Sequence, residues 1–167
     1  IEFENNKLLF DSVKKLHNKG FKIHVIATGK LHLDIIRKND LSNVLTVFNW
    51  LPYEKFTKLI TIADLFSLLQ INNLRNQSRF PNKFGDYLAA GRPIIMNPIG
   101  DLELYVTENP KSFYIVNNEF DNICVQLEIA HERWKNQEIN YNQIYNIALS
   151  HSWDNRAKTL NNFYLKA

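Results

Sequence analysis

The sequence predicts an α/β domain built on a doubly wound parallel sheet, with helices on both faces. Short apolar runs of strand length alternate with segments of helical periodicity along most of the chain. The runs are apolar at nearly every position, a pattern that is typical of strands buried on both faces of a sheet. No internal repeat and no linker-like composition divides the chain, so we expect one domain over residues 1–167.

The individual elements follow from the same signals. Apolar residues recur three and four positions apart from Leu8 to Leu16, which predicts a helix that ends before Gly20. Apolar runs predict strands at 21–29, 44–50, 64–69, 93–97 and 112–116. Helices are expected at 31–39, 53–63, 81–90 and 102–109. A helical extension follows from 119, with one helix to about Trp134 and two more at 140–150 and 152–166.

The expected first strand is missing. A Rossmann-like sheet opens on a strand that lies at its centre, whereas only Ile1-Glu2-Phe3 precede the first helix here. We therefore expect the numbering to begin inside a domain, and the chain to be a fragment of a larger protein. Ligands bind at the carboxyl ends of the strands in such sheets. The candidate loops follow Ala27, Val47, Leu69, Asn97 and Val116.

Composition argues against several classes of function. The net charge is only +3 and the basic residues are scattered, which disfavours a nucleic-acid partner. No apolar run approaches the roughly 18–20 residues of a membrane-spanning helix. The single cysteine, Cys124, permits no internal disulfide and is expected to be a buried thiol. The histidines lack metal-ligand spacing, so we expect no metal site and no cofactor.

The segment RFPNKFGDYLAAGRP carries the strongest functional signal. It lies between two apolar runs, with Pro81 where a helix would begin and Gly91 where it would end. Two cations near a helix N-terminus interact unfavourably with the helix dipole, and an anion bound beside them would offset this repulsion. Backbone N–H groups at such an end bind phosphate, so we expect a phosphate or diphosphate ligand. The side chains that would meet it are Arg79, Asn82 and Lys83.

A family resemblance rests on this segment together with three others. The order of elements and the stretches ADLFSLL, RFPNKFGDYLAAGRPII, NPIGD and HSWDNRAKTLNNFY resemble the C-terminal half of GT-B glycosyltransferases, family 4 or glycosyltransferase group 1. DYLAAGRP parallels the E-A-x-A-x-G-x-P helix of that family, and Trp153 with Ala157 fits the pattern of its last helix. In the family this half binds the nucleotide-sugar donor, and the N-terminal half binds the acceptor.

The resemblance implies roles for particular residues. Asp86 falls at the second Glu of the family's E-x7-E motif, which accepts hydrogen bonds from ribose, whereas Ser78 stands where the first Glu contacts the sugar. Gly100 matches a glycine that lets the ligand approach the backbone. The turn from Asn49 to Leu51 corresponds to the segment that borders the nucleobase. Our own inference is that Arg79 and Lys83 replace the family's phosphate-binding Arg and Lys, since Glu4 falls about where the Lys is expected.

The function implied is that of a donor-binding domain in a retaining, metal-independent glycosyltransferase. Such an enzyme moves a sugar from a nucleotide diphosphate to an acceptor hydroxyl, and no catalytic base is identified in this sequence. The resemblance implies bacterial cell-surface polysaccharide or glycolipid assembly in the cytoplasm, and it allows peripheral association with the membrane. We expect the isolated chain to bind nucleotide weakly and to be inactive without the acceptor-binding domain.

Alternatives stay open at this point. A sugar-nucleotide epimerase of GT-B architecture or a non-catalytic degenerate GT-B module would share the fold, whereas a receiver domain would need an acidic pocket at the strand ends. Asp86 also suits a local salt bridge, Lys83 a solvated charge and Asn82 or Ser78 a helix cap. Packing rather than ligand stacking is expected at Phe80, Tyr87 and Trp153.

Overall fold

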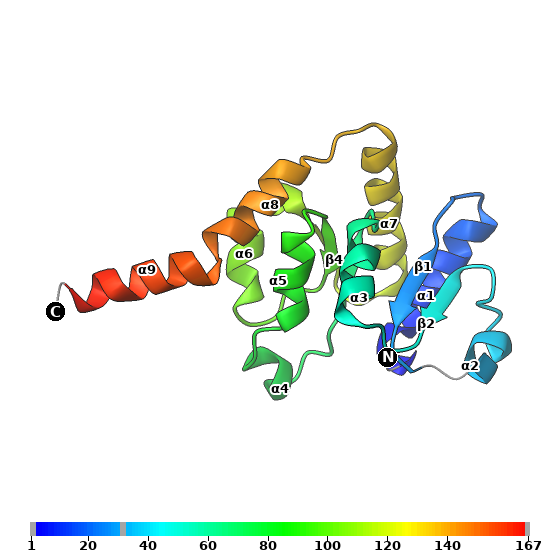
Figure 1. Ribbon diagram of the computed structural model, residues 1–167. Coiled ribbons are helices and arrows are strands. Elements are labelled where there is room, and N and C mark those ends of the chain that lie inside the picture. The colour runs from blue at the N-terminus through cyan, green and yellow to red at the C-terminus, as the bar shows by residue number, and fades with distance from the viewer. Residues whose placement is uncertain (1–2, 31–32, 166–167) are drawn as a thin grey trace.

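The computed structural model describes residues 3–30 and 33–165, and it confirms the alternation of helices with parallel strands (Figure 1). The helices are α1 (Phe3–Asn18), α2 (Leu33–Lys38), α3 (Tyr53–Thr61), α4 (Leu74–Gln77), α5 (Asn82–Ala89), α6 (Leu102–Glu108), α7 (Phe120–Lys135), α8 (Tyr141–Ser150) and α9 (Trp153–Tyr164), with a short 3-10 turn at Pro110–Ser112. The strands are β1 (Val25–Thr28), β2 (Leu45–Phe48), β3 (Phe66–Leu68), β4 (Ile94–Met96) and β5 (Phe113–Ile115).

The parallel sheet is divided into two half-sheets. β1 pairs with β2 alone, and β3, β4 and β5 form a second sheet in that order. All three pairings are parallel, as the apolar runs predict. Within the described residues no backbone hydrogen bond joins β1 to β3. The α/β class is therefore confirmed, and the division of the sheet is a feature that the sequence pattern does not reveal.

The strands are shorter than the apolar runs that predict them. The run from 21 to 29 illustrates the reason, because its first residues belong to the end of α1 rather than to the sheet. The N–H of Phe21 donates to the carbonyl of Leu16 at 3.1 Å, and the N–H of Ile23 donates to Phe21 at 3.0 Å. These turn-like bonds delay the start of β1 to Val25.

Two apolar clusters cover the two faces of the sheet. One cluster joins α1 and α7 to both half-sheets, and it contains the helical stripe from Leu9 to Leu16. The other joins α5, α6 and α8 to β3, β4 and β5. Cys124 on α7 is buried as expected. Because helices pack on both faces, the arrangement is doubly wound.

One helix was not predicted. α4 interrupts the segment between β3 and α5, which the sequence pattern leaves as a loop. Asn73 caps it, since its Oδ1 accepts from the N–H of Asn76 at 2.9 Å, and the Nδ2 of Asn76 donates to the carbonyl of Ile71 at 2.7 Å. Asparagine side chains therefore shape this turn, and hydrophobic periodicity carries no signal of them.

The helical extension ends in a projecting helix. α8 packs against α5, whereas α9 extends away from the body of the molecule (Figure 1). The expectation that Trp153 anchors the C-terminal helices is wrong, because this side chain is 87% exposed. A guanidinium nitrogen of Arg156 instead ties the start of α9 to the hydroxyl of Tyr105 at 3.2 Å. None of the helices in the described part of the chain is long and apolar enough to cross a bilayer.

The exposure of Trp153 gives a test of this arrangement. We expect Trp153→Ala to change the free energy of unfolding by no more than about 0.5 kcal/mol, because surface substitutions away from special features are near neutral. Phe84→Ala on α5 should cost about 3–5 kcal/mol, since Phe84 is only 1% exposed within the second cluster. Urea unfolding of both variants measures the contrast. A large loss in Trp153→Ala would contradict the exposed placement of α9.

Candidate functional site

The carboxyl ends of the strands lie at one end of the molecule. α2 and α4, which follow β1 and β3, are found at this end in Figure 1, together with the first turn of α1. The predicted site residues fall on three segments that follow β2, β3 and β4. They therefore occupy the edge at which parallel α/β sheets bind ligands.

The first turn of α5 carries two of the three predicted anion-binding residues, Asn82 and Lys83, and Arg79 lies in the loop before it. Pro81 is the N-cap of this helix and provides no side-chain cap, so the helix begins at Asn82 rather than at Pro81. The N–H of Phe84 bonds to the carbonyl of Pro81 at 3.0 Å. Asn82 is the first helical residue and not the cap, which removes the capping interpretation for this side chain. The backbone N–H groups of Asn82 and Lys83 precede that bond and point out of the helix end.

The charged side chains of this segment lie in solvent. Arg79, Lys83 and Asp86 are all exposed. Within residues 3–30 and 33–165 no ion pair or side-chain hydrogen bond is recorded for any of the three, so the local salt bridge considered for Asp86 does not form. Lys83 and Asp86 are three positions apart and occupy neighbouring places on the helix surface. The segment presents two cations and a carboxylate that are not engaged by the protein.

Aromatic contacts fix α5 against the sheet. Tyr87 stacks on Phe66 of β3, with ring centroids 4.1 Å apart and planes inclined by 4°. Burial, and then the neighbouring Asp86 charge, raises the pKa of the Tyr87 phenol to about 12. Phe84 meets Phe80 edge-on at 5.6 Å, and Phe80 remains 40% exposed. Tyr87 is therefore a packing residue as expected, and the helix that carries Asp86 has a fixed position.

Ser78 has a capping role at the end of α4. Its N–H donates to the carbonyl of Leu74 at 3.0 Å, and its Oγ donates weakly to the carbonyl of Arg75 at 3.4 Å. The residue is exposed. A short hydroxyl that already bonds its own helix differs chemically from the carboxylate that the family pattern has at this place.

Gly100 brings the loop after β4 against α4. Its φ is +62°, and an added Cβ would lie 2.6 Å from the carbonyl oxygen of Gln77. The residue therefore meets the protein's own backbone, which is a reason for glycine independent of any ligand. Gln77 directly precedes Ser78, so this approach positions the start of the α4–α5 segment.

A buried amide network holds the same loops, and the sequence analysis missed it. The Oδ1 of Asn97 accepts from the N–H of Gln70 at 2.8 Å, and its Nδ2 donates to the carbonyl of Gln70 at 2.6 Å. The Nδ2 of Asn118 donates to the same carbonyl at 3.0 Å. The ends of β3, β4 and β5 are thereby joined. An amide residue at the end of each apolar run or within two positions after it was the available signal.

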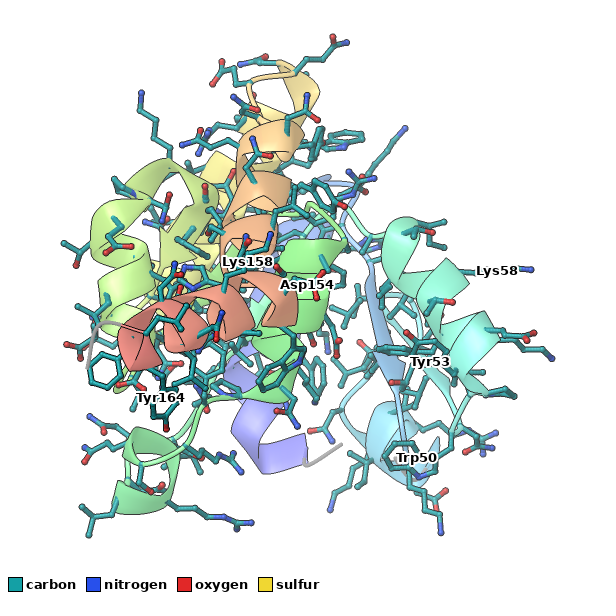
Figure 2. The ribbon with its side chains drawn as sticks, turned by 60° about the vertical axis from the view of Figure 1, so that its left-hand side comes forward. Trp50, Tyr53, Lys58, Asp154, Lys158 and Tyr164 are labelled. Atoms are coloured by element: carbon teal, nitrogen blue, oxygen red, sulfur yellow. The ribbon has the colours of Figure 1, made fainter. Side chains whose placement is uncertain are left out.

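The predicted base-bordering turn belongs to the other half-sheet. Asn49 is exposed and Leu51 half-buried in the loop that follows β2. Trp50 and Tyr53 beside them are 78% and 80% exposed. Figure 2 shows both aromatic residues on the right, apart from α4 at the lower left. The structure thus brings the α4–α5 residues together with Gly100, and it leaves Asn49 and Leu51 as a separate group on the same edge.

A hollow of about 470 Å³ contains none of the predicted residues. It is open to solvent and polar, and it lies between the end of α6 and α8. Its lining includes Glu108, Asn109, Asn140, Gln143, Asn146 and His151. Among the residues that the structure describes, no three His, Cys, Asp or Glu side chains gather as metal ligands. The predicted site is therefore an open surface at the sheet edge.

Comparison with known proteins supplies the fold. No protein-family model matches the sequence, and no curated protein was found to be related. The structure resembles a chain of a solved structure entitled "Crystal structure of GtfA/B complex", with a TM-score of 0.76 over 99% of this chain and 10% sequence identity. Identity this low establishes a shared fold alone. The chain spans about a third of that solved chain, of which it covers 34%.

Two glycines provide a matched test of the loop geometry. Gly100→Ala should destabilise the protein by about 2–4 kcal/mol, because a strained φ and a backbone overlap act together. Gly85→Ala in the middle of α5 meets no atom within 4 Å, and it should stabilise the protein by about 0.5–1 kcal/mol. Thermal unfolding of the two variants gives both values. Equal stability of Gly100→Ala and the parent chain would refute the close approach to Gln77.

Proposed function

We propose that this chain is the donor-binding half of a glycosyltransferase that uses a nucleotide diphosphate sugar. The observation that carries the proposal is the likeness of nearly the whole chain to a chain of the solved structure entitled "Crystal structure of GtfA/B complex". The motif resemblance around α5 points to the same class. The reaction transfers a sugar from the nucleotide diphosphate to an acceptor hydroxyl, by retention and without a metal, as in family 4.

The start of α5 is the diphosphate-binding element in this proposal. Its first N–H groups, the helix dipole and the exposed ammonium of Lys83 converge on one end of the helix. Arg79 is in the loop just before it and is equally free of ion pairs within the described residues. Negative charge grows on the diphosphate as the sugar leaves, and prearranged cations and dipoles stabilise such charge. Lys83 and Arg79 thus stabilise the negative charge on the diphosphate leaving group.

Asp86 and the β2–α3 loop complete the nucleotide site. A carboxylate one turn along α5 from the diphosphate is placed to accept hydrogen bonds from ribose hydroxyls. The backbone from Asn49 to Leu51 borders the base, at the same edge of the fold. Gly100 and Ser78 flank the sugar end, with Asn82 beside them. Because Ser78 replaces a carboxylate, sugar recognition rests on other contacts than in the family.

The acceptor site belongs to another domain. The chain covers 34% of the solved chain that it resembles, and none of its residues is assigned as a catalytic base. The apolar side of α9, which includes the exposed Leu160, Phe163 and Tyr164, offers a surface for the acceptor-binding domain. The whole enzyme would act in the cytoplasm on bacterial cell-surface polysaccharide or glycolipid, with peripheral contact to the membrane. The nucleotide sugar is a substrate, and no cofactor or nucleic acid takes part.

A non-catalytic module is the second candidate. Ser78 in place of the motif carboxylate, its engagement as a helix cap and the open surface favour it. In that case the fold would serve as an interaction domain and would bind no nucleotide. The epimerase alternative lacks a comparable observation.

Nucleotide binding is the test of the proposal. The purified chain is titrated with UDP, GDP, ADP and dTDP by NMR, alongside Lys83→Ala, Asp86→Asn and the control Lys135→Ala at the exposed end of α7. We expect one nucleotide to bind weakly, and Lys83→Ala and Asp86→Asn each to raise its Kd by about 5–30-fold, or ~1–2 kcal/mol. Lys135→Ala should leave the Kd unchanged.

Three outcomes would contradict the proposal or a part of it. Absence of binding at millimolar nucleotide, both in this chain and in a longer chain with the acceptor-binding half, would favour the non-catalytic module. Equal weakening by Lys83→Ala and Lys135→Ala, with tighter binding by Asp86→Asn, would show that general charge, rather than the α5 site, governs binding. Sugar transfer by this chain alone would overturn the requirement for a second domain.

A further inference from the structure

We propose that the side-chain amide of Gln70 binds hydroxyl groups of the donor sugar and contributes to the choice of that sugar. The inference rests on the proposed function, because it needs a nucleotide diphosphate sugar at the start of α5. Three features of the structure carry it. The amide is buried without a partner, it faces the segment before α5, and its two polar atoms match a sugar hydroxyl.

The side chain of Gln70 is buried, yet its polar atoms are unpaired. Only 9% of the residue is exposed. Within the described residues neither its Oε1 nor its Nε2 forms a hydrogen bond. Its backbone is fully engaged, since Asn97 bonds both its N–H and its carbonyl, and Asn118 bonds the carbonyl as well. A buried amide without partners is costly to a fold, so its presence calls for an explanation.

The direction of this side chain follows from the strand that precedes it. Burial alternates from Leu65 to Gln70, so that Phe66, Leu68 and Gln70 are the buried residues of this segment. Alternate residues of an extended segment point to the same face of a sheet. Phe66 and Leu68 belong to the apolar cluster under α5, α6 and α8. Gln70 therefore points to the same face, and the bonds from Asn97 hold its backbone in this position.

The position of Gln70 along the strand sets it beyond the start of α5. Tyr87 of α5 stacks on Phe66, with 4.1 Å between the ring centroids. Gln70 lies about 13 Å further along the chain from Phe66, toward the carboxyl edge of the sheet. α5 connects two parallel strands and runs antiparallel to them, and from Tyr87 back to its first residue, Asn82, it spans only about 8 Å. The amide is therefore level with the loop of residues 78–81.

The loop after β4 holds the same two places together. Its Asn97 side chain bonds the backbone of Gln70. An added Cβ on Gly100 in the same loop would lie 2.6 Å from the carbonyl oxygen of Gln77. Three residues of chain span at most about 11 Å, so Gln70 and Ser78 both lie beside one short loop. In the proposed function Ser78 and Gly100 flank the sugar end of the donor.

The chemistry of the amide favours a sugar hydroxyl over a phosphate. Nε2 donates hydrogen bonds and Oε1 accepts them, and both atoms need a partner. A phosphate oxygen only accepts, so it would satisfy Nε2 and leave Oε1 buried without a donor. Sugar hydroxyls both donate and accept, so one or two neighbouring hydroxyls satisfy both atoms. A buried group of this kind discriminates strongly against a sugar that lacks the matching hydroxyl, because its own polar atoms are then left unpaired.

The first test needs no ligand. Gln70→Met keeps the length of the side chain and removes its two hydrogen-bonding atoms. Because the fold leaves this amide unpaired, the substitution should raise the Tm of the unliganded chain by about 2–4 °C. An unchanged or lowered Tm would overturn the proposal, since the amide would then be satisfied within the unliganded protein.

The second test compares nucleotides with and without the sugar. The chain is titrated by NMR with UDP, GDP, ADP and dTDP, and with UDP-glucose, GDP-mannose, ADP-glucose and dTDP-glucose. Gln70→Met should raise the Kd of the sugar nucleotide that binds by about 5–30-fold, and it should change the Kd of the matching nucleoside diphosphate by less than about twofold. The control is Gln126→Met, at a half-buried position of α7, which covers the opposite face of the sheet. It should change neither Kd.

The outcomes separate this proposal from the proposed function. Equal changes in the two Kd values, or no change in either, would overturn the role of Gln70 and leave the donor site in place. Binding of a nucleoside diphosphate but of none of the four sugar nucleotides would do the same. Absence of binding by all eight compounds, in this chain and in a longer chain with the acceptor-binding half, would overturn both.

Discussion

The pairing of the Asn97 side chain with the backbone of Gln70 is the constraint on which the candidate site depends. β3 ends at Leu68, and beyond it the Asn97 amide takes the place of the next backbone partner, with bonds of 2.8 and 2.6 Å. Both residues are buried, so loss of the Asn97 side chain would leave the N–H of Gln70 unsatisfied, at a cost of about 1–3 kcal/mol, whereas the carbonyl of Gln70 would keep its bond from Asn118. The loops after β3 and β4 are thereby held together, and Gly100 can approach Gln77 at the end of α4.

This constraint separates the parts of the site that are fixed from those that are free. Tyr87 stacked on Phe66 fixes α5 to the sheet, and the Gly100 contact fixes the segment before it. The ammonium of Lys83 at the first turn opposes the helix dipole by only a few tenths of a kcal/mol when exposed. Such a charge contributes little to the fold, whereas it suits an anionic ligand. The proposed donor site is therefore a rigid helix end whose cations form no ion pair within the described residues.

The extent of prediction differs between levels of structure. Apolar runs located every strand, because burial on both faces leaves a continuous signal in the sequence, and Pro81 and Gly91 marked α5 to within a residue. The order of the strands across the sheet leaves no such signal in the sequence, so the division between β1 and β3 was not predicted. α4 was missed because it depends on the Asn73 cap rather than on apolar spacing. Trp153 was misjudged because an aromatic residue in a helical pattern looks the same whether its helix is packed or projects.

The exposure of the candidate site and the division of the sheet into two half-sheets are related. The edges beside Ile26 and Ser67 face the division between the half-sheets, and the loop of Asn49 and the first turn of α5 with Lys83 follow strands of the two half-sheets. Because no backbone hydrogen bond joins β1 to β3 within the described residues, Asn49 and Leu51 do not share one hydrogen-bonded sheet with the α4–α5 segment. A ligand that must first order the two half-sheets relative to each other binds more weakly, because the free-energy cost of that ordering reduces its affinity. Weak binding by this chain would then reflect the divided sheet.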